Sequence, residues 1–159
     1  MPEGGANELA VKGTSEILDE IDAQDYICCP VGTGGTIAGI INASNHKQKV
    51  IGFPAIKGFD TLEKDIKNWT NKQNYEFINN YVSGGYGKVS EELVEFINQF
   101  YLMQNIPLDA IYTGKMMLGI IDLVAKDYFL KGSSILAIHT GGLQGNRGIN
   151  ERLGISLPS

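Results

Sequence analysis

Glycine and threonine residues at positions 32–36 give this chain a segment suited to binding an anion. The segment reads Gly32-Thr33-Gly34-Gly35-Thr36 and lies between an apolar run and a stretch with helical character. Glycines let the backbone turn tightly and approach a ligand without a Cβ clash. The N–H groups of a first helical turn then point at the anion, and the threonine hydroxyls can add hydrogen bonds. The pattern therefore predicts a phosphate site.

The loop alone leaves a second interpretation open. It lacks the Lys-Ser/Thr pair that completes a Walker A loop, and its glycines do not have the G-x-G-x-x-G spacing. A glycine-rich turn between a strand and a helix is also often just a tight connection. A phosphate site and a plain turn are both compatible with these five residues.

Further turns rich in Gly, Thr and Tyr follow other predicted strands or extended pieces. They lie at 83–87, which carries Tyr86, at Tyr112-Thr113, and at 140–143. Because the carboxyl ends of parallel strands meet at one edge of a sheet, we expect these turns to gather beside the first glycine loop. The two tyrosines are candidate site residues, and their alternative role is that of ordinary tyrosines at the boundary of the core.

The elements that position these turns alternate between strand and helix patterns. Strand followed by loop, helix and strand within about 30 residues is a βαβ unit. The sequence thus predicts one α/β domain over residues 1–159, with a mostly parallel twisted sheet of four or five strands and helices on both faces in three layers. We expect strands at 26–31, 50–53, 75–82 and 134–139, an extended piece at 109–112, helices at 8–23 (interrupted at Gly13), 37–42, 58–69, 91–104 and 116–129, and either a loose segment or a short helix at 144–159.

Apolar residues at helical spacing mark the faces that should be buried. The expected stripes are Leu9, Ile17, Leu18 and Ile21 in the first helix, Leu62, Ile66 and Trp69 in the helix at 58–69, and Leu93, Phe96, Ile97, Phe100 and Tyr101 in the helix at 91–104.

Composition and charge narrow the class of protein. The 159 residues suffice for one hydrophobic core, and the net charge of −5 disfavours nucleic acid and anionic membranes as partners. No apolar stretch reaches the length of a membrane span, and the N-terminus has no signal-peptide pattern, so we expect a cytoplasmic protein. Cys28 and Cys29 are adjacent on a predicted strand and should face opposite ways, which disfavours a metal site or a disulfide between them.

Five motifs together resemble those of a known family. They stand in the same order and at similar spacings as in the 1-aminocyclopropane-1-carboxylate deaminase / D-cysteine desulfhydrase family, whose members are pyridoxal-phosphate enzymes of the tryptophan-synthase β-like fold (fold type II). The resemblance covers nearly all of this chain but only about the C-terminal half of a family member. The motifs are Pro2-Glu3-Gly4-Gly5-Ala6-Asn7, Gly32-Thr33-Gly34-Gly35-Thr36, Gly84-Gly85-Tyr86-Gly87, Tyr112-Thr113-Gly114-Lys115 and His139-Thr140-Gly141-Gly142.

The resemblance implies a role for each matching position. The loop from Gly32 to Thr36 would hold the phosphate of pyridoxal phosphate. Tyr112 and Tyr86 would flank the substrate as catalytic residues, with Tyr112 placed to act as a nucleophile or as an acid–base group. Thr113 would face the pyridine nitrogen, where the ring-opening deaminases carry a carboxylic acid. A hydroxyl there makes a weaker electron sink, which suits β-elimination and favours the desulfhydrase branch.

The resemblance also implies what this chain lacks. The lysine to which the family attaches its cofactor belongs to an N-terminal part that is absent here, and Lys115 matches a different family lysine. We therefore expect a fragment, inactive alone, of a homodimeric enzyme that releases ammonia and an α-keto acid from a small amino acid. A non-catalytic module that binds a phosphorylated ligand or a protein partner is the alternative. Exposed apolar surface would favour the enzyme fragment, and a polar surface all round would favour the module.

Overall fold

Strands and helices alternate along the chain, as the sequence predicts. The computed structural model describes residues 7–19, 21, 24–55, 59–82 and 88–159. In chain order the elements are α1 (Glu8–Ser15), the 3-10 helix η2 (Glu16–Leu18), β1 (Tyr26–Val31), α2 (Gly35–Ala43), β2 (Lys49–Pro54), α3 (Phe59–Trp69), β3 (Tyr75–Phe77), α4 (Glu91–Gln104), α5 (Thr113–Ala125), β4 (Ile135–Ala137) and α6 (Gln144–Leu153).

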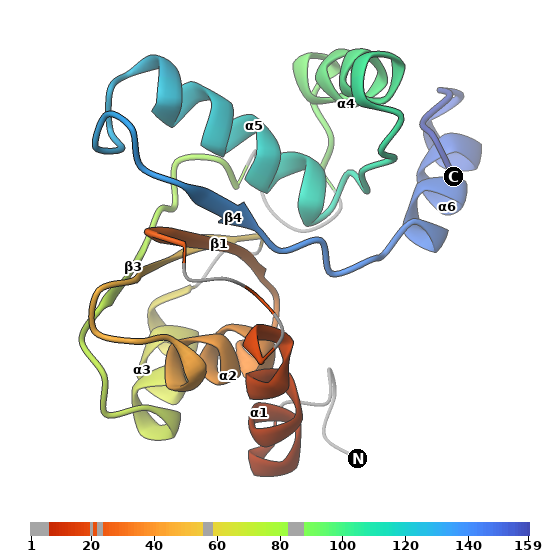
Figure 1. The fold of residues 1–159 in the computed structure, drawn as a ribbon. Helices are drawn as coiled ribbons and strands as arrows, with labels where there is room; N and C mark the ends of the chain where they lie inside the picture. Colours follow the sequence, from red (N-terminus) through yellow and green to blue (C-terminus); the bar gives the residue numbers. More distant parts are fainter. Residues whose placement is uncertain (1–6, 20, 22–23, 56–58, 83–87) are drawn as a thin grey trace.

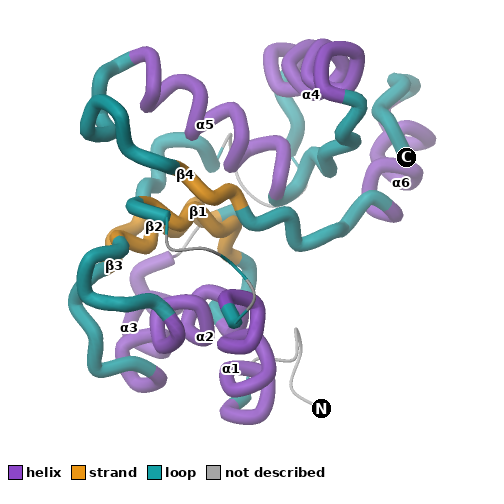
Figure 2. The backbone as a smooth tube through the Cα atoms, in the orientation of Figure 1, coloured by secondary structure: helices purple, strands orange, loops and turns teal. Residues whose placement is uncertain are grey.

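The strands form a parallel sheet in the order β3-β2-β1-β4. In its register, Cys28 of β1 lies opposite Ile51 of β2 and Ala137 of β4. Helices α1, α2 and α3 lie on one side of the sheet, and α4, α5 and α6 lie on the other (Figure 1). Figure 2 shows the same three layers, with the strands between two sets of helices. The expected α/β fold, a parallel sheet with helices on both faces, is confirmed.

The central strand β1 divides the core into two parts. Ile27, Cys29 and Val31 pack with α2 in one cluster, whereas Tyr26 and Cys28 pack with α5 in another. This split follows from the alternation of side chains along a strand. The two cysteines are free and buried and, as expected, face opposite sides of the sheet. Burial raises the pKa of the Cys28 thiol to about 12, so it is protonated and unreactive at neutral pH.

Helices α1 and α2 touch at Gly39. A Cβ atom on Gly39 would lie 2.1 Å from Thr14 Oγ1 and 2.5 Å from the carbonyl oxygen of Val11. The absence of a side chain at Gly39 therefore allows the two helices to pack closely. The expected apolar face of α1 is only partly correct, because Leu9 is 81% exposed and Ile21 is 37% exposed. Gly13 does not interrupt α1, which continues past it to Ser15.

Beyond α5, a third cluster joins α4, α6 and the segment before α5. Leu93 and Ile97 of α4 are fully buried in it together with Ala110, and Leu108 and Ile149 complete its buried part. The expected stripe on α4 is correct at Leu93 and Ile97 and also at Phe96 and Phe100, which are partly buried against the cluster. It is wrong at Tyr101, which is 39% exposed near the end of the helix.

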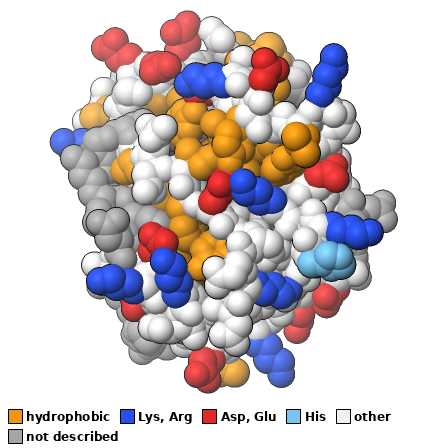
Figure 3. Space-filling view, turned by 90° about the vertical axis from the view of Figure 1, so that its left-hand side faces the viewer, with side chains coloured by type: hydrophobic (Ala, Val, Ile, Leu, Met, Phe, Trp, Pro, Cys, Tyr) orange, Lys and Arg blue, Asp and Glu red, His pale blue; other side chains and the backbone are white. Residues whose placement is uncertain are grey.

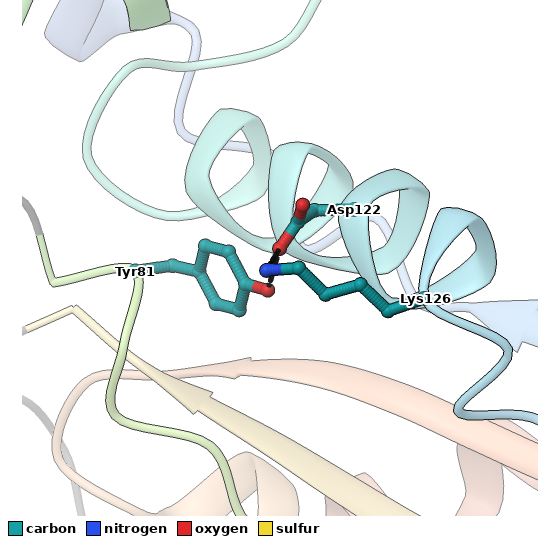
Figure 4. A network of polar contacts seen from close by, with 3 residues as sticks. All are labelled: Tyr81, Asp122 and Lys126. Carbon is teal, nitrogen blue, oxygen red and sulfur yellow. Dashed lines mark hydrogen bonds and ion pairs between the residues drawn. The ribbon is translucent and has the colours of Figure 1, made fainter.

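The third strand is shorter than the alternating residues at 75–82 suggest. β3 pairs with β2 only from Tyr75 to Phe77. Tyr81 instead reaches α5, where its hydroxyl hydrogen-bonds to the carboxylate of Asp122, which also pairs with Lys126 at 2.6 Å (Figure 4). The chain therefore leaves the sheet after Phe77 because its next aromatic residue is anchored to a helix.

Apolar side chains remain exposed on the surface of the described residues. Leu102, Met103 and Leu130 are each at least 70% exposed, and Val124 of α5 is 52% exposed. The face seen in Figure 3 carries a broad apolar area bordered by lysine, arginine and acidic side chains. None of the helices in the described part of the chain has the length and apolar character needed to span a bilayer.

Candidate functional site

A cavity of about 290 Å³ opens at the carboxyl ends of β1 and β4. This is the edge at which parallel α/β sheets bind their ligands. The glycine loop forms one part of its lining, and residues from the turns before α5 and after β4 form the rest. The lining residues are Pro30, Val31, Gly32, Thr33, Gly34, Gly35, Thr36, Ile37, Tyr112, Thr140, Gly141, Gly142 and Gln144.

The glycine loop turns at Gly34, immediately before α2. Gly34 has a φ of +89°, a conformation that favours glycine. A Cβ atom there would also lie 2.8 Å from Cγ1 of Ile66. The first α-helical hydrogen bond runs from the N–H of Ala38 to the carbonyl oxygen of Gly34 at 3.0 Å. The N–H groups of residues 35–37 precede that bond and so have no acceptor four residues back within the helix, which leaves them directed toward the cavity end of α2.

Tyr112 stands against this loop. A Cβ atom on Gly32 would lie 3.2 Å from Cε1 of Tyr112 and 3.3 Å from its hydroxyl oxygen. The ring therefore occupies the space that the missing side chain of Gly32 leaves. The structure brings the predicted tyrosine and the predicted phosphate loop together in one cavity.

Thr113 has a different environment from the one expected. It is fully buried and is not among the residues that line the cavity. Its hydroxyl donates to Oδ2 of Asp109 at 2.6 Å and accepts from the N–H of Asp109 at 2.9 Å. This placement does not support a contact between Thr113 and the pyridine nitrogen. It also does not support the preference for the desulfhydrase branch, which depends on that contact.

Other predicted positions lie outside the described residues. Tyr86 and the glycines around it belong to the segment 83–87. Of the first family-like motif, Pro2 to Asn7, only Asn7 is among the described residues. The role expected for Tyr86 therefore stays a prediction. Asn7 caps α1, with its side-chain oxygen accepting from the N–H of Ala10 at 2.9 Å.

Several residues of the site have little signal in the sequence. Thr140 lines the cavity and belongs to the turn at 140–143, which was expected to gather beside the glycine loop. Gln144 also lines the cavity but was not predicted to lie there. His139 does not line it: its Nδ1 accepts from the N–H of Gly141 at 3.1 Å, and its Nε2 bonds to the carbonyl of Pro107 at 2.9 Å. His139 thus stabilises the turn after β4 by linking it to the segment before α5.

The described lining carries hydroxyl, amide and backbone donors and no ionisable side chain other than the Tyr112 phenol. Lys115, the lysine that follows Tyr112 most closely, is buried, and its Nζ donates to the carbonyl of Val82 at 3.0 Å. Burial lowers the pKa of Lys115. Anion binding at this cavity therefore depends on backbone N–H groups, the helix dipole and hydroxyls.

These donors fit a phosphate group. Side-chain-free positions at Gly34 and Gly35 leave room for an anion at the start of α2, and Thr33 and Thr36 place hydroxyls beside it. The helix dipole adds about 0.3–1 kcal/mol for a charge at its N-terminus. The fold and the cavity together define an α/β domain with a glycine-rich loop suited to an anion and with a tyrosine beside that loop.

Comparison with known proteins gives the family. Residues 1–141 match the family described as "Pyridoxal-phosphate dependent enzyme", and the chain belongs to it. The cofactor of this family is pyridoxal phosphate, as expected. A Pyrococcus abyssi protein named provisionally as a 1-aminocyclopropane-1-carboxylate deaminase is 30% identical, over 91% of this chain and 50% of its own length. The bifunctional mitochondrial D-cysteine desulfhydrase/1-aminocyclopropane-1-carboxylate deaminase of Arabidopsis thaliana is 32% identical, over 91% of this chain and 41% of its own.

Solved structures agree with the fold. The crystal structure of an ACC deaminase homologue superposes with a TM-score of 0.81 at 26% identity, covering 96% of this chain and 52% of that one. Threonine deaminase isoform 2 of Solanum lycopersicum shares the fold, with a TM-score of 0.57 at 17% identity over 91% of this chain and 50% of its own. The chain thus spans about half the length of the relatives it matches.

Proposed function

We propose that this chain supplies the phosphate-binding part of a pyridoxal-phosphate enzyme that releases ammonia and an α-keto acid from a small amino acid. The observation that carries the proposal is the meeting of Tyr112 with the loop Gly32–Thr36 in one cavity. The named activities of the relatives, 1-aminocyclopropane-1-carboxylate deamination and D-cysteine desulfhydration, define the two substrates to be compared.

The residues of this chain have separate tasks in the proposal. The N–H groups of residues 35–37, with the hydroxyls of Thr33 and Thr36, hold the phosphate. When bound, pyridoxal phosphate supplies an electron sink that allows bonds at the α-carbon of an amino acid to break. The Tyr112 hydroxyl, beside Gly32 in the same cavity, holds or moves a proton of the substrate. The walls formed by Gly141 and Gly142 exclude water on the side of β4.

Exposed apolar side chains favour this proposal over a non-catalytic module. A complete module of this size should cover residues such as Leu102, Met103 and Leu130, which are largely exposed here. Such surface fits a chain that packs against further protein, either the remaining half of the family's length or a second copy. We propose a homodimer as the working assembly, which sedimentation of the completed enzyme will test.

The decisive experiment compares two tyrosine variants in a chain completed upstream with the other half of the family's length. Keto acid and ammonia are measured from D-cysteine and from 1-aminocyclopropane-1-carboxylate, for the parent, Tyr112→Phe and Tyr101→Phe. Loss of a proton-transferring group costs about 10²–10⁴-fold in rate, so Tyr112→Phe should fall by that factor. Tyr101→Phe, which alters an exposed tyrosine of α4, should retain the parent rate.

Two outcomes would contradict the proposal. Equal rates for the two variants would remove Tyr112 from the chemistry. Phosphate binding without keto-acid release from any small amino acid, in the completed and folded chain, would instead support a non-catalytic phosphate-binding module. The chain alone, which the resemblance implies to be without the cofactor-anchoring lysine, should bind phosphate but show no turnover.

A further inference from the structure

The buried carboxylate of Asp109 is bound to the turn that carries Tyr112. Its Oδ1 accepts hydrogen bonds from the N–H groups of Ile111 at 2.8 Å and Tyr112 at 2.7 Å. Its Oδ2 accepts from the N–H of Thr113 at 2.8 Å and from the Thr113 hydroxyl at 2.6 Å. One side chain thus satisfies three consecutive backbone donors and a hydroxyl in the interior of the protein.

These bonds replace the usual cap of α5. Tyr112 occupies the N-cap position, but its own side chain makes no capping hydrogen bond. Asp109 supplies that cap from three residues earlier, and its backbone carbonyl also accepts from the N–H of Gly114 at 2.8 Å. Four successive N–H groups, from Ile111 to Gly114, are therefore tied to Asp109. The backbone of Tyr112, and with it the direction of its Cα–Cβ bond, is fixed by these contacts.

The residues on either side of Asp109 are held by a side chain of α6. The side-chain amide of Asn146, buried on α6, accepts from the N–H of Ala110 at 3.0 Å and donates to the carbonyl of Leu108 at 2.9 Å. Gly142 also lies close to Asp109, since a Cβ atom on it would stand 3.3 Å from Cγ of Asp109. Since Gly142 lines the cavity, Asp109 lies directly behind this part of the cavity wall.

We infer that Asp109 is a positioning residue for Tyr112: its carboxylate sets the direction in which the tyrosine ring enters the cavity beside Gly32. This inference rests on the proposed function for its consequence, but its geometry concerns this chain alone. Only a carboxylate fits, because both oxygens of Asp109 must accept. The amide nitrogen of an asparagine at the Oδ2 position would face the N–H of Thr113, donor against donor, and the turn would have to rearrange.

Fluorine NMR of the chain labelled with fluorotyrosine tests this inference without any turnover. Tyr112→Phe identifies the resonance of position 112, which is then followed in Asp109→Asn. Asp25→Asn is the matched control, because the Asp25 carboxylate also accepts from an N–H and a hydroxyl, both of Ser134 at 2.7 and 2.9 Å. Asp25 lies just before β1, at the end of the sheet away from the cavity.

The resonance of Tyr112 should move by more than its linewidth in Asp109→Asn and stay in place in Asp25→Asn. The affinity for inorganic phosphate should change by less than about threefold in Asp25→Asn, because Asp25 lies at the far end of the sheet and distant sites act independently. An unmoved Tyr112 resonance in folded Asp109→Asn would overturn the inference. If the parent chain binds no phosphate, the proposed function fails, whereas the resonance shift still decides the role of Asp109.

A second variant covers the case in which Asp109→Asn does not fold. Thr113→Val removes the hydroxyl that donates to Oδ2 of Asp109 and accepts from the Asp109 N–H, and it leaves the Asp109 carboxylate in place. It should move the Tyr112 resonance in the same direction by a smaller amount. No movement in folded Thr113→Val, with Asp109→Asn unfolded, would contradict the inference.

Discussion

The hydroxyl oxygen of Tyr112 lies 3.3 Å from the point at which a Cβ atom on Gly32 would stand. The two residues come from segments that are far apart in the sequence, and they meet at the carboxyl end of β1. Tyr112 follows a turn held by Asp109, and Gly32 follows the last residue of the strand. A glycine at this position therefore provides the space for the tyrosine as well as a flexible backbone for the loop.

Gly32→Ala should displace Tyr112 while leaving the sheet intact. The new Cβ would meet the ring at 3.2–3.3 Å, which requires a movement of a few tenths of an ångström. Since misplacement of a reacting group by about 1 Å can cost about 100-fold in rate, we expect a loss of roughly tenfold in keto-acid release by the completed enzyme. Gly148→Ala on α6, where a Cβ meets nothing within 4 Å, is the control. Equal rates for the two variants would show that the Tyr112 ring is not displaced by a Cβ atom at position 32.

A pair of glycines with the same backbone conformation separates strain from binding. Gly34 and Gly132 have φ of +89° and +84°, so an alanine is strained at both. Only Gly34 lies in the cavity lining, and its Cβ would also press on Ile66. Loss of one aligned donor to a charged group is worth about 1.5–3 kcal/mol. The phosphate affinity measured by calorimetry should therefore fall tenfold or more in Gly34→Ala and change little in Gly132→Ala, whereas similar affinities would place the anion elsewhere.

Alanine at Gly39 should destabilise the fold. Its Cβ would lie 2.1 Å from Thr14 Oγ1 and 2.5 Å from the Val11 carbonyl, so α1 must move away from α2. Overpacking of this kind costs about 1–3 kcal/mol of unfolding free energy. Gly13→Ala is the matched change on the exposed side of α1, where nothing lies within 4 Å, and it should stabilise by about 0.5–1 kcal/mol. Thermal unfolding measures both, and a stable Gly39→Ala would contradict the close contact.

The Tyr81 phenol should ionise at a higher pH than an ordinary tyrosine. Burial, together with the hydrogen bond to Asp122, raises its pKa to about 12. Because the neutral phenol is favoured in the folded state, this contribution to stability is complete below pH 10, the ordinary tyrosine pKa, and is lost as the pH rises from about 10 to 12. In Asp122→Asn the pKa of Tyr81 should fall part of the way back, because burial, the larger cause, remains.

Tyrosinate absorbance during a pH titration measures this shift. Tyr81→Phe identifies the contribution of that ring, and Tyr101→Phe, which changes an exposed tyrosine, serves as the control. An unchanged late ionisation in Asp122→Asn would mean that burial alone sets the pKa. The same carboxylate has its own pKa lowered, first by the hydrogen bond from Lys126 and then by that from Tyr81.

Local sequence patterns predicted the order of most strands and helices but not all of their bounds, since the strand expected at 134–139 extends only over Ile135–Ala137. The apolar run of β1, the glycine loop and the start of α2 follow directly from residue types, and the opposite facing of Cys28 and Cys29 follows from strand geometry. The alternation at 75–82 misled because Tyr81 packs on α5 rather than continuing β3. The exposure of Leu9 could not be read from α1 alone, since it depends on what other elements cover that face.

Within the site, the main difference between the predicted and the observed structure is the turn before α5. Residues 109–112 were expected to be extended, and residues 110–112 form a turn instead. The cause is the Asp109 carboxylate, which collects the N–H groups of the next residues. An aspartate shortly before a Thr-Gly helix start is the sequence feature that could have indicated this capping. The partner from α6, Asn146, carries no such local signal because its role depends on tertiary contact.

The most direct test follows the backbone N–H resonances of the nitrogen-labelled chain during a titration with inorganic phosphate. The resonances of Gly35, Thr36 and Ile37 should move first and furthest and saturate together with a change at Tyr112, because these groups surround the proposed phosphate position. Saturating shifts elsewhere, with the resonances of these three residues unmoved, would contradict the central claim that the start of α2 and Tyr112 share one anion.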